Sequence, residues 1–167
     1  MKPKTVGRVK TGQNRPEHAQ DSCYGIAVGT PIMTSDGSLP VEFLTAGDRI
    51  VTRNGGMTKL EGIDAVTRLT HAVRVSSDFL GGEAEMDIML PADQPVLVRD
   101  WRATAAFGLQ QTMAAAGHLV DGVNFRDVGP RRMVLFRLSF DRPRIVYSHG
   151  LELGTEPGVN LPLRNVA

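Results

Sequence analysis

G-I-A-V-G-T-P-I-M-T-S-D-G-S-L-P-V-E-F-L-T-A-G-D-R-I-V-T-R-N-G-G, residues 25–56, is the stretch that decides the fold. Three turn signals divide it, at residues 35–37, 46–48 and 54–56, where glycine stands beside aspartate or asparagine. Glycine accepts a positive φ and aspartate bonds its own backbone, so these triplets favour tight turns. Between the last two turns, the β-branched run at residues 49–52 is typical of a strand. The stretch predicts short strands joined by tight turns.

The rest of the chain follows the same pattern. Short apolar runs bounded by turn residues predict further strands within residues 60–75, 86–90, 96–98, 133–140 and 145–147. Residues 101–116 predict helix, in short pieces because Gly108 interrupts them, with Trp101 as a packing anchor. Residues 151–167 hold Pro and Gly at intervals and predict a tail. The fold class is therefore predicted to be all-β.

Length and composition limit the number of domains and the classes of partner to expect. With 167 residues, 41% of them hydrophobic, the chain suits one domain with its own core. A net charge of +1 gives no reason to expect nucleic acid. No apolar run approaches the roughly 18 residues of a membrane span, and no apolar core follows the basic N-terminus as in a secretory signal. A cytoplasmic location is therefore expected, and the lone Cys23 excludes an intramolecular disulfide.

We expect three segments along the chain. Residues 1–22 are polar and basic without periodicity, which predicts a flexible tail. Residues 23–157 carry the strand pattern and predict the folded domain. Residues 158–167 are expected to form a C-terminal tail.

The order of pieces in the opening stretch resembles a Hint (hedgehog/intein) domain, in particular the bacterial Hint-domain proteins. That family has the pattern C-x-x-x-G-T-x-I-x-T-x-x-G-x-x-P-V-E-x-L-x-x-G-D-x-V-x-T. The matching positions are Gly29, Thr30, Ile32, Thr34, Gly37, Pro40, Val41, Glu42, Leu44, Gly47, Asp48, Ile50 and Thr52. The resemblance implies a curved, horseshoe-like β fold with short helical pieces.

Three later segments extend the resemblance, in the right order. L-P-A-D-Q-P-V-L-V at residues 90–98 is similar to the family's S-P-x-H-x-V-L-V. Residues 101–122 hold W-R-A, F-G and an H-L-V segment, and F-D-R-P-R-I-V-Y at residues 140–147 is similar to F-D-R-H-E-I-V-Y. Four separated segments are more specific than one motif.

The resemblance also implies where self-processing chemistry would lie, and those positions are replaced here. The family's reactive Cys attacks the carbonyl just before it, and a Ser/Thr and a His hold and protonate the leaving amide. The Cys position is Gly25, the Ser/Thr position Pro91, that His position Gln94, and the His of F-D-R-H is Pro143. Gln cannot transfer a proton near neutral pH, and Pro offers no such group at all. The resemblance thus implies a degenerate site with no intact catalytic residue.

Cys23 is the alternative nucleophile. It lies two residues before Gly25, a displacement of roughly 6–7 Å in an extended chain. The histidines, at positions 18, 71, 118 and 149, have no metal-ligand spacing, so neither a metal nor a cofactor is expected. Asp93 and Asp141 lie near the replaced positions and are expected to bond turn backbone groups.

Two functional hypotheses follow. The first is a non-enzymatic Hint-like domain that acts as a structural or interaction module, with a protein partner. The second is autocatalytic, cysteine-dependent self-processing through an N–S acyl shift at Cys23.

Overall fold

The computed structural model describes residues 22–81 and 84–157. The predicted tail at residues 1–22, apart from Ser22, and the predicted tail at residues 158–167 lie outside this part of the chain. The strands are β1 (Ile26–Ala27), β2 (Pro31–Thr34), β3 (Gly37–Pro40), β4 (Arg49–Thr52), β5 (Gly56–Lys59), β6 (Gly62–Val75), β7 (Ile88–Pro91), β8 (Pro95–Val98), β9 (Thr112–Ala115), β10 (Phe125–Ser139), β11 (Ile145–Ser148) and β12 (Leu151–Gly154). The helical pieces are α1 (Trp101–Phe107) and the 3-10 turns η2 (Val41–Phe43) and η3 (Ala116–Leu119). The predicted all-β class with short helical pieces is confirmed.

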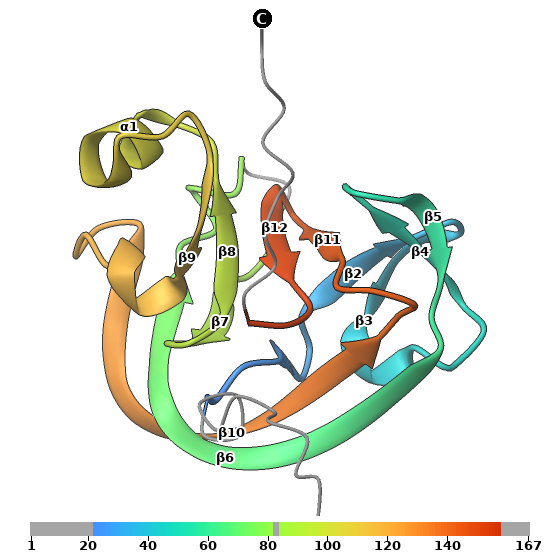
Figure 1. The fold of residues 1–167 in the computed structure, drawn as a ribbon. Coiled ribbons are helices and arrows are strands. Elements are labelled where there is room, and N and C mark those ends of the chain that lie inside the picture. Colours follow the sequence, from blue (N-terminus) through green and yellow to red (C-terminus); the bar gives the residue numbers. More distant parts are fainter. Residues whose placement is uncertain (1–21, 82–83, 158–167) are drawn as a thin grey trace, which may run out of the picture.

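The strands form two sheets. One has the order β1-β10-β6-β7, and the other has the order β3-β2-β4-β11-β12-β8-β9, with β5 added to β4. Within the first sheet, β6 and β10 pair antiparallel from Gly62↔Ser139 to Val75↔Phe125. Figure 1 shows this pair as a long curved ribbon that passes beneath the central strands β11 and β12. The horseshoe-like curvature expected from the resemblance lies in this ribbon.

The prediction of several short strands within residues 60–75 was wrong, because β6 is one strand of 14 residues. Its first half is mostly exposed and carries polar side chains such as Asp64, Thr67 and Arg68. Hydrophobic alternation is therefore weak there, although backbone pairing with β10 continues. The ladder of hydrogen bonds, which sequence periodicity does not report, keeps the strand intact.

The helical prediction for residues 101–116 is confirmed only for its first half. Asp100 caps α1 by accepting the N–H of Arg102, and Gly108 ends the helix in the left-handed conformation with φ 67°. Residues 112–115 instead form β9, which pairs with β8 from Val98↔Thr112 to Pro95↔Ala115. The edge of β8 was open to a partner, and this pairing overrode the helix propensity of Ala and Met.

Two further predictions about side chains and tails were wrong. Trp101 is not a packing anchor, since 72% of it is exposed on α1. Residues 151–154 are not part of a tail: they form β12, which is buried along its whole length between β11 and β8. The strand has only four residues, Glu152 among them, and this is too short a run for its L-E-L alternation to be distinguished from a tail.

Two of the predicted turns form, and apolar side chains make up the core. Residues 35–36 turn between β2 and β3, and Thr34 Oγ1 donates to the carbonyl of Gly37 at 2.7 Å. Residues 53–55 turn between β4 and β5. The main apolar core lies between the two sheets and includes Ile32, Ile50, Leu90 and Leu153, each with no exposed surface.

The core predicts a clear difference between two leucines. Leu90→Ala in β7 removes a fully buried side chain, so the free energy of unfolding should fall by about 2–5 kcal/mol. Leu69→Ala on the ribbon is the matched control, because that side chain is 70% exposed, and it should change stability by less than about 0.5 kcal/mol. Urea unfolding followed by fluorescence measures both. Equal effects of the two substitutions would contradict the placement of the core.

Candidate functional site

Gln94 has a fully buried side-chain amide that joins three parts of the chain. Its Oε1 accepts the N–H of Gly25 at 3.1 Å, and its Nε2 donates to the carbonyls of Gly154 at 2.8 Å and Pro95 at 3.1 Å. The N–H can only donate and the carbonyls can only accept, so the orientation of the amide is fixed. The amide thus connects the start of β1 to β8 and β12.

Gln94 owes its position to a tight turn between β7 and β8. Its backbone N–H donates to the carbonyl of Pro91 at 2.9 Å. Pro91 is buried at the end of β7, where it is the register partner of Ala72. The neighbouring Asp93 accepts the N–H of Cys23 at 3.0 Å. Asp93 and Gln94 therefore each hold a backbone N–H of the chain that enters β1.

Gly25 occupies a position with no space for a side chain. Its φ is +142°, a conformation that L residues rarely adopt. A Cβ built on Gly25 would lie 2.9 Å from Leu135 Cβ and 3.2 Å from the carbonyl oxygen of Phe136. Neither atom can move by a change of rotamer, because one is backbone and the other is fixed to it.

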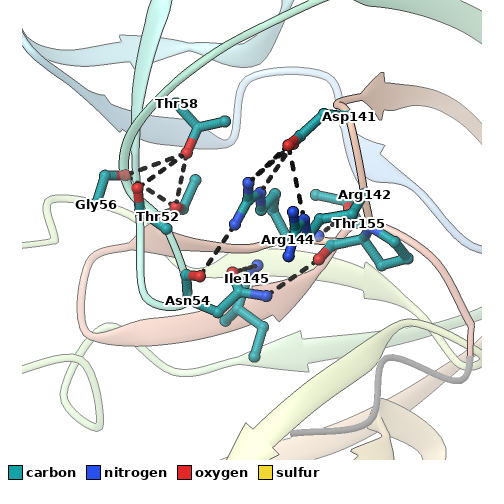
Figure 2. Close-up of polar contacts among 11 residues, drawn as sticks. Thr52, Asn54, Gly56, Thr58, Asp141, Arg142, Arg144, Ile145 and Thr155 are labelled. Atoms are coloured by element: carbon teal, nitrogen blue, oxygen red, sulfur yellow. Dashed lines mark hydrogen bonds and ion pairs between the residues drawn. The ribbon is translucent and has the colours of Figure 1, made fainter. Parts of the chain in front are cut away.

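Pro143 lies in the loop before β11, and Asn54 in the turn between β4 and β5 holds this loop. Figure 2 shows Asn54 beside Arg144 and Ile145. Asn54 Nδ2 donates to the carbonyl of Pro143 at 3.0 Å, and Asn54 Oδ1 accepts the N–H of Ile145 at 3.1 Å. Arg144, only 7% exposed, donates from Nη1 to the carbonyl of Asn54 at 2.9 Å. A Cβ on Gly55 would overlap this guanidinium, so a larger residue there would require Arg144 to move away from the turn.

Asp141 completes this network. Arg144 Nη2 donates to Oδ1 at 2.8 Å and to Oδ2 at 3.1 Å. The Arg144 hydrogen bonds hold the pKa of the Asp141 carboxyl below its ordinary value, although partial burial acts in the opposite direction. Asp141 thus mainly accepts hydrogen bonds from the Arg144 guanidinium. The sequence had predicted that it would bond backbone groups of a turn.

The structure brings three of the four replaced positions into one neighbourhood and links the fourth to it. Gly25 and Gln94 are in direct contact, and Pro91 lies in the same turn as Gln94. Arg144, which follows Pro143, exchanges two 2.9 Å hydrogen bonds with Thr155. Gly154, the residue before Thr155, accepts from Gln94. The assignment of lost catalytic roles to these positions stays a prediction.

The described histidines lie elsewhere. His71 faces Asp127 at 3.5 Å on the exposed ribbon, and His118 is exposed in η3. His149 occupies the turn between β11 and β12 with φ 42°, and it lines a surface hollow of about 590 Å³ with residues 28–31 and 85–89. His18 lies outside the described residues. Within residues 22–81 and 84–157, neither Gly25 nor Gln94 hydrogen-bonds a histidine.

This arrangement holds the backbone of the chain that enters β1 through Asp93 and Gln94. A glutamine amide binds both donors and acceptors, yet it has no proton that transfers near neutral pH. Gly25 provides no nucleophile. Across residues 22–81 and 84–157, no group of three or more His, Cys, Asp and Glu side chains is arranged to hold a metal ion. None of the helices in the same residues has the length and hydropathy of a membrane span.

Sequence reasoning missed two charged residues. Glu152 is 5% exposed, and it pairs with Arg53 at 2.8 Å and with Arg99 at 2.7 Å. Its position between two leucines was a signal that this charge is buried and paired. Arg137 reaches the chain beside Gly25, at Tyr24 and Ser22. Nothing in its local sequence indicated this contact, because Arg137 and Tyr24 are separated by 113 residues in the sequence.

Solved structures similar to this chain include an intein-like domain and several inteins. The solution structure of a bacterial intein-like domain from Clostridium thermocellum has a TM-score of 0.54 at 15% identity, covering 81% of this chain and 99% of that one. The crystal structure of the gp41-1 intein has a TM-score of 0.46 at 9% identity, covering 79% and 98% of the two chains. The crystal structure of the MchDnaB-1 intein has a TM-score of 0.47 at 14% identity, covering 77% and 98%. The first of these places the chain in the class of intein-like folds.

The family follows from the sequence profile of the Hint domain, which matches residues 23–156. The chain belongs to the Hint domain family, as its sequence motifs predicted. A search among curated proteins found no match in sequence.

The Asp141–Arg144 pair predicts a pH dependence of stability. The pKa of Asp141 is lower in the folded chain, so its carboxylate stabilises the fold above the ordinary range near 4. This contribution is lost as the pH falls through the folded-state pKa. Asp141→Asn should therefore be less stable than wild type at pH 7, and the difference should shrink below about pH 4.

Urea unfolding at several pH values measures this difference. Asp78→Asn, an exposed aspartate in the loop after β6, is the control and should leave the pH dependence unchanged. A difference between Asp141→Asn and wild type that stays constant down to acidic pH would show that Arg144 does not depend on this carboxylate.

Proposed function

We propose that this Hint domain no longer cleaves its own backbone and instead acts as a structural or interaction module. One observation carries the proposal. The N–H of Gly25 is held by Gln94 at 3.1 Å, and Gly25 has no side chain that could act as a nucleophile. By the family resemblance, the peptide between Tyr24 and Gly25 takes the place of the scissile bond. The site therefore binds this peptide group but has no nucleophile to cleave it.

Both the residue type and the geometry at position 25 support the absence of a nucleophile there. Self-processing needs a thiol or hydroxyl at position 25, carried on a Cβ. The φ of +142° and the contacts with Leu135 and Phe136 both oppose a Cβ there. The backbone is adapted to glycine, so a reactive side chain cannot be restored by exchanging one residue alone.

The missing proton transfer supports the same proposal. Acid-base assistance is worth roughly 10²–10⁴ in rate, and it requires a group that gives a proton to the leaving nitrogen. Gln94 accepts the N–H of that nitrogen through a carbonyl oxygen. Pro91 and Pro143 have no side-chain proton to give.

Exposed apolar side chains favour an interaction role. Trp101 and Phe107 on α1 and Leu109 just after it are 72%, 41% and 45% exposed. These three exposed side chains are available for contact with another protein.

The alternative remains cleavage by Cys23, and one observation favours it. The carbonyl of Ser22, which such a thiol would attack, accepts from Arg137 Nη2 at 3.4 Å. Attack by Sγ would form a C–S bond, break the Ser22–Cys23 C–N bond and move the thiol proton to the amine, leaving a thioester for water to hydrolyse. The leaving nitrogen, however, must gain a proton in this reaction. Asp93 accepts the N–H of Cys23, so in this contact it does not donate a proton to that nitrogen.

Intact mass distinguishes the two functions. The purified wild-type chain should remain one species of 18.1 kDa after incubation with dithiothreitol or hydroxylamine, because both acid-base help and a correctly placed nucleophile are missing. Cys23→Ala should behave identically. A fragment that begins at Cys23 in wild type and is absent from Cys23→Ala would establish the alternative function.

Position 25 gives a second test that does not depend on cleavage. Gly25→Ala adds only a Cβ, and backbone strain with steric contact should lower the free energy of unfolding by about 1–3 kcal/mol. Gly29→Ala is the matched control, since Gly29 also has a positive φ of 85° but has nothing within 4 Å of a Cβ. The difference between the two losses of unfolding free energy measures the steric contact of a Cβ at position 25. Equal costs at both glycines would mean that the pocket can accept a side chain.

A further inference from the structure

Residues 22–25, termed here the entry arm, are held along one edge by two neighbouring side chains. Asp93 accepts the N–H of Cys23 at 3.0 Å, and Gln94 accepts the N–H of Gly25 at 3.1 Å. In an extended chain the N–H groups of residues i and i+2 point to the same side. Two consecutive residues of one turn therefore match the spacing of one edge of an extended peptide.

A single guanidinium holds the other edge. Arg137 Nε donates to the carbonyl of Tyr24 and Nη2 donates to the carbonyl of Ser22, each at 3.4 Å. These carbonyls belong to the same two peptide groups whose N–H atoms meet Gln94 and Asp93. Each of the two peptide groups is thus contacted at both its donor and its acceptor.

The guanidinium also packs on the side chain between them. The Arg137 Cζ lies 4.4 Å from the centroid of the Tyr24 ring, within the range of cation–π attraction. In the described part of the chain, Arg137 forms no ion pair, so its charge is directed to the two carbonyls and the ring. Both hydrogen bonds are long, so the charge and the stacking contribute much of the attraction.

The position of Arg137 on β10 explains how one residue reaches the entry arm. Arg137 follows Phe136, which is the register partner of Ile26 in β1. The side chain is half-buried. The hydroxyl of Ser22 is buried as well. The arm is therefore enclosed where it approaches the ribbon.

We infer that Arg137, Asp93 and Gln94 form a binding site for an extended peptide, and that its occupant is the chain's own entry arm with Tyr24 as the recognised side chain. This inference rests on the proposed function, because an arm that was cut would leave the site. Arg137 is a positioning residue here: it fixes the path of residues 22–25. The peptide class is an extended backbone with an aromatic residue whose ring stacks on the guanidinium.

Amide hydrogen exchange in the full chain tests the inference. Arg137→Ala should speed exchange of the Cys23 amide by about tenfold or more, because its remaining acceptor Asp93 is exposed to water. The Gly25 amide should speed up by a smaller factor, because its acceptor Gln94 is fully buried. Arg137→Lys keeps the charge but loses the two-pronged donor, so its effect should be intermediate. Tyr24→Phe should behave as wild type, whereas Tyr24→Leu should speed exchange at Cys23 because it loses the ring face. NMR of the ¹⁵N-labelled protein resolves each amide.

Arg132→Ala is the matched control, since Arg132 lies exposed on the same strand. It should leave exchange at Cys23 and Gly25 unchanged. The inference is overturned if Arg137→Ala leaves the Cys23 amide as protected as in wild type. It is also overturned if the amides of β7 and β12 accelerate by the same factor, which would show general loss of stability.

Intact mass measured on the same samples separates this inference from the proposed function. A chain of full mass with unchanged exchange in Arg137→Ala contradicts only the peptide site. A shortened chain contradicts the proposed function, whatever the exchange rates are.

Discussion

The side-chain amide of Gln94 is the interaction on which the rest of the centre depends. It is fully buried, so each of its polar atoms must find a partner inside the protein, and it finds Gly25, Pro95 and Gly154. An apolar residue of similar size would remove all three hydrogen bonds, at a cost of about 1–3 kcal/mol for each buried group left without a partner. The amide therefore fixes where β1 begins relative to both β8 and β12. Through Gly154 and Thr155 this constraint extends to Arg144 and to the turn at Asn54.

The fold and the chemistry of a self-processing domain make different demands on the same positions. The fold needs a group that accepts the N–H of residue 25, and a glutamine carbonyl does this as well as an imidazole does. Cleavage needs in addition a transferable proton and a nucleophile. Under the proposed function, Gln94 meets only the first of these demands. The backbone of Gly25 packs against Leu135, where a reactive side chain would need space. The family architecture can thus persist with the peptide held in place.

The sequence was informative where local chemistry decides the structure. Turns at residues 35–37 and 54–56 and the strand at residues 96–98 were predictable, because glycine, aspartate and β-branched residues act over a few positions. The contact of Gly25 with Gln94 was accessible only through the family resemblance. The full length of β6 was not predictable, because its exposed half is held by pairing with β10 and shows no apolar period. Trp101, Glu152 and Arg137 were misjudged or missed, since their surroundings come from residues distant in sequence.

The long ribbon has a consequence for the order in which the protein forms. Residues that meet at the centre are 69 apart for Gly25 and Gln94, 60 apart for Gln94 and Gly154, and 113 apart for Tyr24 and Arg137. β1, with only two residues, has nothing to pair with until β10 exists. On a ribosome, residues 22–25 emerge early but must wait for β10 and β12 before they can dock. The first part of the domain to be synthesised is therefore among the last to reach its native place, and such non-local topologies fold slowly.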